Sequence, residues 1–422
     1  GGKIIAIAKP GSDAGIDSEN GTYINGGEVI ATNDFIKGQW LTGAGEMLLI
    51  FTIVMGYFMM GSFRRQAERT PDLDPGKAAF NYLSSRIKGL MPTFIFGTLL
   101  AFVVMCIHWH INYGLELKYM PLLLLESVFQ IFGLQISGLG YGNNYLLALG
   151  VGTSLADTCF NGPLWYISAM FICCYFLYYF LAKNKDAFVN VFCPAYLLIF
   201  GGWMCYAQIR ASWKNWILPI TLTSYTSGSS VTTSFGAINI GLAYVAMGMI
   251  AGVLLNVAVT KLKEHEFTKG QKTLLTVLNV LFSVILITYM INPGWYTYTV
   301  TTDEGTSSIG MYRWTVHFLC AAVVFLTLLN EDGLTALLNK GVVGKALGYL
   351  GSLSLYIYII HMPLFYLINL VMNGFSAGTT DCLYLFIINP VLSIIISAKD
   401  VKRGKPFPYV YEFASEYMNL SI

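Results

Sequence analysis

Long apolar segments without charge alternate along the chain with short polar segments that carry most of the basic residues. A hydrocarbon core about 30 Å thick needs about 20 helical residues, and a charge at its centre costs about 3 kcal/mol. Nine apolar segments reach or approach this length: 44–61, 90–108, 163–182, 190–207, 237–258, 273–291, 315–330, 346–370 and 382–398. Residues 160–182 and 215–260 contain no Asp, Glu, Lys or Arg. The pattern predicts an all-α, polytopic membrane protein with about nine transmembrane helices.

The segments between these spans differ in composition. Residues 1–43 are rich in Gly, Asn and Asp, which favours an exposed leader outside the cytoplasm. Met120 to Ile136 has a broad apolar face and predicts an interfacial or re-entrant helix. Residues 208–236 and 292–313 are rich in Ser, Thr or Tyr and predict external loops. We therefore expect a leader (1–43), one transmembrane domain (44–400) and a short tail (401–422).

The basic residues predict which ends of the spans face the cytoplasm. When successive loops are assigned to alternating sides, one set of loops holds eighteen of the 25 Lys and Arg residues. The other set holds only Lys118, Arg210, Lys214 and Arg313. Cytoplasmic loops carry the excess of Lys and Arg, so the rich set and the C-terminus are expected to be cytoplasmic.

Nine spans and a cytoplasmic C-terminus place the N-terminus outside. The longest apolar stretch before residue 44 runs from Ile4 to Ala8, which is too short for the apolar region of a signal peptide. We therefore expect a further transmembrane helix before Gly1.

Composition supports the membrane assignment and argues against a nucleic-acid-binding protein and against a metal site. The chain is 55% hydrophobic and only 11% charged, with a mean hydropathy of +0.59. Soluble domains are about 25% charged. A net charge of +2, spread over the flanks of spans, does not predict a nucleic-acid partner. Most of the eight Cys lie inside apolar segments, and no Cys or His spacing predicts a metal site.

A basic cluster lies at the expected cytoplasmic end of the first two spans. Arg86 and Lys88 precede Pro92, and Arg64 and Arg65 follow the first span. Arg binds phosphate through two parallel hydrogen bonds and Lys adds a point charge, so these four residues could hold an anionic cofactor. Ordinary positive flanking of a span explains the same residues, and on spacing alone it is the simpler interpretation.

A second motif, Asn161-Gly-Pro-Leu-Trp165-Tyr166, begins a span at its expected external end. Pro is favoured at the first turn of a helix, and Trp and Tyr commonly anchor spans at the interface. These general preferences explain the residue types, but they explain the whole string less easily.

The third motif places His361 within an uncharged segment that extends from Ala346 to Thr380. Ionisable groups at membrane depth are costly and commonly face a cavity or a partner. Ser354 and Tyr358 lie seven and three residues before His361, so all three share one helical face. Function is the favoured interpretation, and packing is the alternative.

In this order and spacing, the three motifs resemble acyltransferase family 3, the integral membrane O-acyltransferases. The resemblance covers residues about 44–400 and rests on the basic stretch before Pro92, the Gly-Pro-Leu-Trp-Tyr string and the closing Ser-Leu-Tyr-x-Tyr-x-x-His-x-Pro string. It implies ten helices with both ends in the cytoplasm. The family's first helix carries an Arg and, about three turns later, a His. No such pair occurs in these 422 residues, in line with the expected additional helix.

The resemblance implies transfer of an acyl group, usually acetyl from cytoplasmic acetyl-CoA, to a hydroxyl of a cell-surface or extracellular glycan. It implies a multi-pass protein of the bacterial inner membrane that uses acyl-CoA as donor and no metal. His361 becomes the candidate catalytic base, and Arg64, Arg65, Arg86 and Lys88 become candidates for binding the CoA phosphates. The candidate acceptor-binding residues are Glu46, Asn161, Trp165, Tyr166, Ser354 and Tyr358. Glu46 could equally remain solvated, and the two aromatic residues could equally be interfacial anchors.

Two other classes of function fit the same pattern. A transporter or flippase of a glycan or small solute would also be polytopic, Tyr-rich and basic on its cytoplasmic side. A catalytically inactive membrane partner is the other possibility. Binding of acetyl-CoA would separate the enzyme from both. The sequence does not indicate the acceptor sugar, the acyl chain or the oligomeric state.

Overall fold

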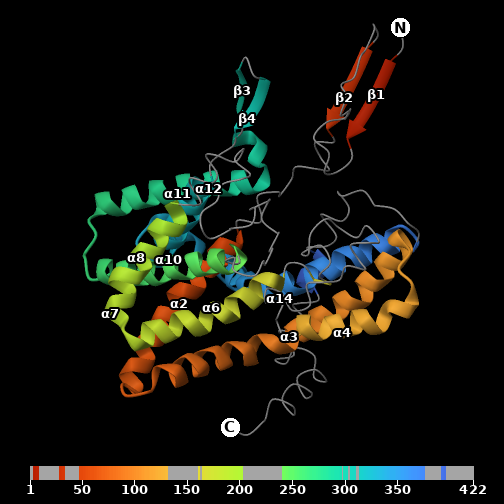
Figure 1. Cartoon of the computed structure of the whole chain (residues 1–422). Coiled ribbons are helices and arrows are strands. Elements are labelled where there is room, and N and C mark those ends of the chain that lie inside the picture. Colours follow the sequence, from red (N-terminus) through yellow and green to blue (C-terminus); the bar gives the residue numbers. More distant parts are fainter. Residues whose placement is uncertain are drawn as a thin grey trace.

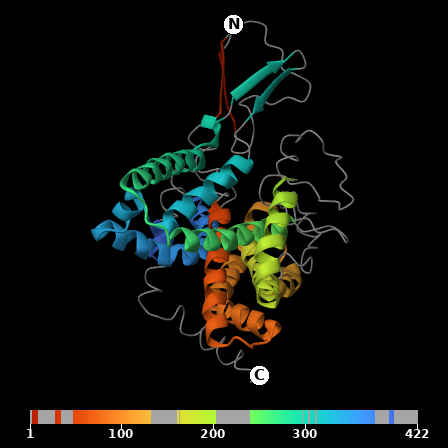
Figure 2. The same ribbon diagram turned by 90° about the vertical axis from the view of Figure 1, so that its left-hand side faces the viewer.

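The computed structural model shows a bundle of long helices, with two small strand pairs projecting from one end of it (Figures 1 and 2). The structure describes residues 3–8, 28–33, 47–131, 160–161, 164–202, 240–296, 298–302, 305–309, 313–375 and 391–395.

Seven of the predicted spans correspond to long helices. They are α2 (Met47–Arg69), α3 (Pro75–Tyr113), α6 (Trp165–Lys183), α10 (Ile240–Leu262), α11 (Lys269–Ile291), α12 (Arg313–Leu329) and α14 (Gly341–Met372). Within the described part of the chain, six helices are long and apolar enough to cross a membrane, and Thr315–Leu329 is a shorter apolar helix. The prediction of an all-α polytopic membrane protein is confirmed.

The remaining two predicted spans differ from regular α-helices or lie largely outside the described residues. The segment 185–201 is one continuous helical rod that alternates α-helical and π-helical turns: α7 (Lys185–Ala187), η4 (Phe188–Phe192), α8 (Cys193–Tyr196) and η5 (Leu197–Gly201). Of the last predicted span, 382–398, only 391–395 is described, and it is helical.

Short strands and a helix occupy segments between or before the predicted spans. In the leader, β1 (Lys3–Ala8) pairs in parallel with β2 (Glu28–Asn33). In the predicted external loop 292–313, β3 (Tyr298–Thr302) and β4 (Gly305–Ile309) form an antiparallel hairpin. The predicted helix after Met120 is present as α4 (Met120–Ile131). The predicted loop 208–236 and the tail 401–422 lie outside the described residues.

Glycines allow α2 and α10 to pack with their backbones in contact. A Cβ atom added to Gly56 would lie 1.9 Å from the Met249 carbonyl oxygen. One added to Gly248 would lie 1.8 Å from Thr52 Oγ1, and one added to Gly252 would lie 1.9 Å from the Ile53 carbonyl oxygen. Gly248 and Gly252 form a Gly-x-x-x-Gly pair, the pattern that brings helices together in membranes through close van der Waals contact.

Gly252→Ala is expected to destabilise the protein because the added methyl group would push α2 away from α10. Overpacking of a tight interior contact costs about 1–3 kcal/mol. Thermal unfolding of the detergent-purified protein measures this loss. The matched control is Gly270→Ala at the start of α11, where nothing lies within 4 Å of the added Cβ. Equal unfolding midpoints for the two variants would contradict this account of the α2–α10 contact.

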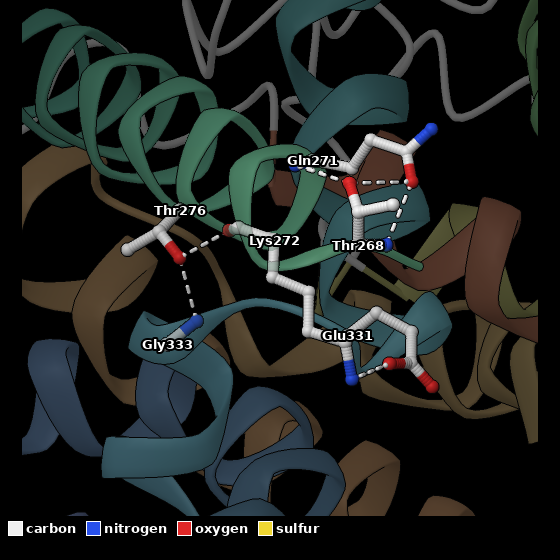
Figure 3. Close-up of polar contacts among 6 residues, drawn as sticks. All are labelled: Thr268, Gln271, Lys272, Thr276, Glu331 and Gly333. Carbon is white, nitrogen blue, oxygen red and sulfur yellow. Dashed lines mark hydrogen bonds and ion pairs between the residues drawn. The ribbon is translucent and has the colours of Figure 1, made fainter. Parts of the chain in front are cut away.

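Polar contacts fasten the start of α11 to the segment between α12 and α14 (Figure 3). Thr268 and Gln271 form a capping box at the start of α11. Lys272 Nζ lies 2.8 Å from Glu331 Oε2, and Thr276 Oγ1 accepts a hydrogen bond of 2.7 Å from the Gly333 backbone N–H. Gly333 begins the short helix α13 (Gly333–Leu338). This end of the bundle therefore has side-chain links between segments 57 residues apart.

Candidate functional site

Two stacked tyrosines lie where α3 and α6 meet, near the Lys- and Arg-rich end of the bundle. The rings of Tyr82 and Tyr178 stack with their centroids 4.5 Å apart. The guanidinium carbon of Arg86 lies 5.1 Å from the centroid of the Tyr82 ring. The Tyr178 hydroxyl donates a 2.6 Å hydrogen bond to Gln66 Oε1 on α2. Helices α2, α3 and α6 therefore converge on these four residues, which we call the arginine–tyrosine cluster.

Arg86 retains unused capacity to donate hydrogen bonds. Its Nε atom is buried and has no hydrogen-bond acceptor among the described residues. The ion pairs found in the described part of the chain are Lys118–Glu116 and Lys272–Glu331, so no described carboxylate neutralises Arg86. A buried, unpaired guanidinium donor is costly unless an anion or water binds it. The cluster is therefore suited to an anionic ligand.

The other three predicted cations differ from Arg86 in exposure and in hydrogen bonding. Arg64 donates a 2.7 Å hydrogen bond from Nη1 to Thr260 Oγ1 on α10. Arg65 is exposed on the next position of α2. Lys88 is exposed and lies two residues after Arg86, a spacing that does not put both side chains on one face of a helix. Arg86 thus belongs to the cluster itself, whereas Arg64 is directed towards α10.

The hydrogen bond of His361 determines which ring nitrogen carries a proton. His361 lies in α14, and its Nδ1 atom is 2.7 Å from the Tyr358 carbonyl oxygen. A carbonyl can only accept, so Nδ1 must carry the hydrogen. In the neutral ring, Nε2 then carries the lone pair. This is the tautomer that a general base requires.

Two tyrosines lie close to this histidine, and a serine lies two turns before it on α14. The Tyr358 and His361 rings lie 5.7 Å apart, and Tyr166 at the start of α6 meets Tyr358 edge-on at 5.8 Å. Ser354 donates a 2.8 Å hydrogen bond to the Gly351 carbonyl in its own helix. The structure therefore brings together Tyr166, Tyr358 and His361 from two of the predicted motifs.

Asn161 reaches α14 from the turn before α6. It is fully buried, and its Nδ2 donates a 2.8 Å hydrogen bond to the Ile359 carbonyl oxygen. The side chain of Trp165 and all of Glu46 lie outside the described residues, so their predicted roles remain predictions.

The arginine–tyrosine cluster and the histidine occupy different levels of the same helices. Gly97 of α3 contacts α14 at Ile359, where an added Cβ would lie 2.2 Å from Ile359 Cγ2. Gly97 is eleven residues beyond Arg86, which corresponds to about 17 Å along a helix. On α6, Tyr178 and Tyr166 are twelve residues apart, or about 18 Å. Helices α3 and α6 thus extend from the arginine–tyrosine cluster near the basic end to the level of His361, deeper in the bundle.

Sequence reasoning missed several residues of the arginine–tyrosine cluster and of the contact between α3 and α14. Tyr82 lies four residues before Arg86, so helical spacing could have identified it as a neighbour. No sequence signal identified Tyr178, Gln66 or Gly97, because each contributes through a contact with a helix distant in the sequence.

The Acyl_transf_3 family model, described as an acyltransferase domain, matches residues 34–398. No curated protein and no solved structure matches the chain.

Proposed function

This chain belongs to the acyltransferase family whose model matches residues 34–398, and we propose that it transfers an acetyl group from acetyl-CoA to a hydroxyl of a cell-surface or extracellular glycan. Family and apolar helices together make the chain a multi-pass membrane protein of an acyltransferase family. The donor, the acceptor, the inner membrane and the cytoplasmic C-terminus belong to the proposal.

One observation carries the choice of donor. Arg86 holds an unpaired, buried guanidinium nitrogen beside two stacked aromatic rings. The phosphates of CoA are anions that a guanidinium binds through charge-assisted hydrogen bonds. Arg65 and Lys88 add positive charge at this end, which the excess of Lys and Arg assigns to the cytoplasm, where acetyl-CoA is available.

His361 supplies the acid–base chemistry. Acetyl-CoA delivers the acetyl group as a thioester. His361 Nε2 takes the proton from the acceptor hydroxyl while the hydroxyl oxygen forms a bond to the acetyl carbonyl carbon. As the carbon–sulfur bond breaks, the same nitrogen returns the proton to the departing sulfur, so the histidine finishes neutral. The Nδ1–H bond to Tyr358 holds the ring in the tautomer that can act twice in this way.

In this proposal Tyr166 and Tyr358 orient the acceptor. They meet beside His361, at the start of α6 and in the middle of α14, away from the arginine–tyrosine cluster. Aromatic rings with a hydroxyl offer an apolar face for a sugar and a hydrogen-bonding edge. In this assignment Ser354, Trp165 and Glu46 remain additional candidates for contact with the acceptor.

Binding of acetyl-CoA to the detergent-purified, full-length protein tests this function. Isothermal titration calorimetry is expected to show saturable binding that free CoA competes for and that weakens as salt is raised. Absence of binding at millimolar acetyl-CoA would contradict the enzyme and favour a glycan or solute transporter, or a non-catalytic membrane partner.

A further inference from the structure

Helix α14 contains a break in its own hydrogen bonding two residues from His361. In an α-helix each carbonyl oxygen accepts from the N–H four residues later. Pro363 lies inside α14, and a proline has no backbone N–H. The Ile359 carbonyl oxygen, four residues earlier, therefore lacks the usual donor four residues later in the helix. Both Ile359 and Pro363 are buried, so water does not freely satisfy this oxygen.

Asn161 provides the missing donor. Its Nδ2 atom lies 2.8 Å from the Ile359 carbonyl oxygen, across 198 residues of sequence. The Asn161 backbone carbonyl accepts a 3.0 Å hydrogen bond from Leu164 N, at the turn that leads into α6. Residue 160 is held in turn, because its backbone N–H donates a 3.1 Å hydrogen bond to Gln130 Oε1 of α4. Hydrogen bonds to the start of α6 and to α4 thus hold the backbone on either side of the Asn161 side chain.

The position of this bond connects it to His361. Asn161 binds residue 359, His361 binds the carbonyl of residue 358, and Pro363 closes the same turn. The Asn161 hydrogen bond, from the turn before α6, and the Gly97 contact, from α3, hold residue 359 from two sides. Any movement of this turn would move the His361 ring with it.

We propose that Asn161 is a positioning residue for the transfer reaction: by supplying the hydrogen bond that Pro363 removes from Ile359, it fixes the turn of α14 that aims His361. The inference rests on the proposed function of His361. It assigns the Nδ2 donor of Asn161 to the protein's own backbone.

Kinetics separate this role from a purely structural one. Asn161→Ala is expected to lower kcat about 10- to 100-fold, since small displacements of a catalytic group have effects of this size, and to leave KM for acetyl-CoA unchanged. The matched control is Asn256→Ala. Asn256 is also buried and also donates through Nδ2 to a helix backbone, the Tyr57 carbonyl oxygen at 3.0 Å. Asn256→Ala is expected to lower the unfolding midpoint but not kcat. An unchanged kcat in Asn161→Ala, or an equal kcat loss in both variants, would overturn the proposal.

A second experiment does not depend on activity. Pro363→Ala returns an N–H to the helix, which then satisfies the Ile359 carbonyl without Asn161. Asn161→Ala is therefore expected to lower the midpoint of thermal unfolding in the wild-type background and to have little effect in the Pro363→Ala background. If Asn161→Ala alone fails to fold, the double variant is expected to recover the folded protein. An equal loss in both backgrounds, or no recovery, would overturn the link between Asn161 and Ile359.

The histidine itself provides a third readout. The chain has five His residues, so the ring nitrogens of His361 can be assigned by comparing ¹⁵N-histidine spectra of the wild type and His361→Ala. Wild type is expected to show the Nδ1–H form of His361, and Asn161→Ala is expected to lose this single form. A spectrum identical to wild type would overturn the positioning role. A wild-type protein that transfers no acetyl group but shows the expected thermal coupling and spectra would instead refute the proposed function alone.

Discussion

His361→Ala is expected to lower acetyl transfer about 100-fold or more, because positioned acid–base groups contribute about 10²–10⁴-fold to catalysis. The ring is the only group in the described part of α14 that can accept and return a proton near neutral pH, and its Nδ1–H bond to Tyr358 leaves Nε2 free to do so. The measurement is the rate of acetyl transfer by the purified protein at saturating acetyl-CoA.

His361→Gln separates loss of the base from loss of the hydrogen bond. A glutamine amide can still donate to the Tyr358 carbonyl but cannot take up a proton. We therefore expect this variant to unfold near the wild-type temperature and to be as inactive as the alanine variant. His265→Ala, on an exposed residue, is the matched control and is expected to keep wild-type activity. Normal transfer by His361→Gln would leave this histidine only a packing role.

Arg86→Ala is expected to raise the Kd for acetyl-CoA about 10- to 100-fold, since a hydrogen bond to a charged group contributes about 1.5–3 kcal/mol. The unpaired Nε atom and the position over the Tyr82 ring make Arg86 the strongest candidate for contact with phosphate. Calorimetric titration with acetyl-CoA measures the change. Arg86→Lys keeps the charge but loses the planar group of donors, so it is expected to bind more weakly than wild type and more tightly than Arg86→Ala.

Lys183→Ala is the control for charge alone. Lys183 is exposed at the same end of α6, and its ammonium lies 5.9 Å from the centroid of the Tyr179 ring, outside the arginine–tyrosine cluster. Acetyl-CoA binding is expected to be unchanged in this variant. If Lys183→Ala weakened binding as much as Arg86→Ala, the basic end would act only through its overall positive electrostatic potential, and not through a specific contact of Arg86.

The sequence predicted the helices because burial in a bilayer imposes a strong local signal. An apolar segment of about 20 residues is read directly from residue types, and seven such segments correspond to long helices. The same reasoning makes Arg86 and His361 candidates, since charged or ionisable groups stand out in apolar surroundings. It did not predict the π-helical turns at Phe188–Phe192, which change hydrogen bonding without changing the apolar pattern.

The parts of the site that the sequence did not indicate depend on contacts between distant segments. The motif around Asn161 indicates the start of a span at its external end, and Pro363 enters only as part of the closing string. That the Asn161 amide replaces the donor that Pro363 lacks follows only from the packing of the α6 entry against α14. Similarly, stacking of Tyr82 on Tyr178 depends on how α3 packs against α6.

The strand pairs had weaker local signals. The segment Tyr298–Thr302 is rich in Tyr, Thr and Val, residue types that favour strands, but its position between two spans favoured a loop. In the leader, Lys3–Ala8 and Glu28–Asn33 each contain only six residues and pair across a long insertion. Short strands of this kind are specified by pairing rather than by local pattern.

The most direct test of the account is the release of CoA thiol from acetyl-CoA by the full-length protein in lipid nanodiscs, followed with and without a glycan acceptor. We predict release that requires the acceptor, yields an acetylated glycan, and falls about 100-fold or more in His361→Ala. No release, or release at the same rate in wild type and His361→Ala, would contradict a transfer reaction catalysed at His361.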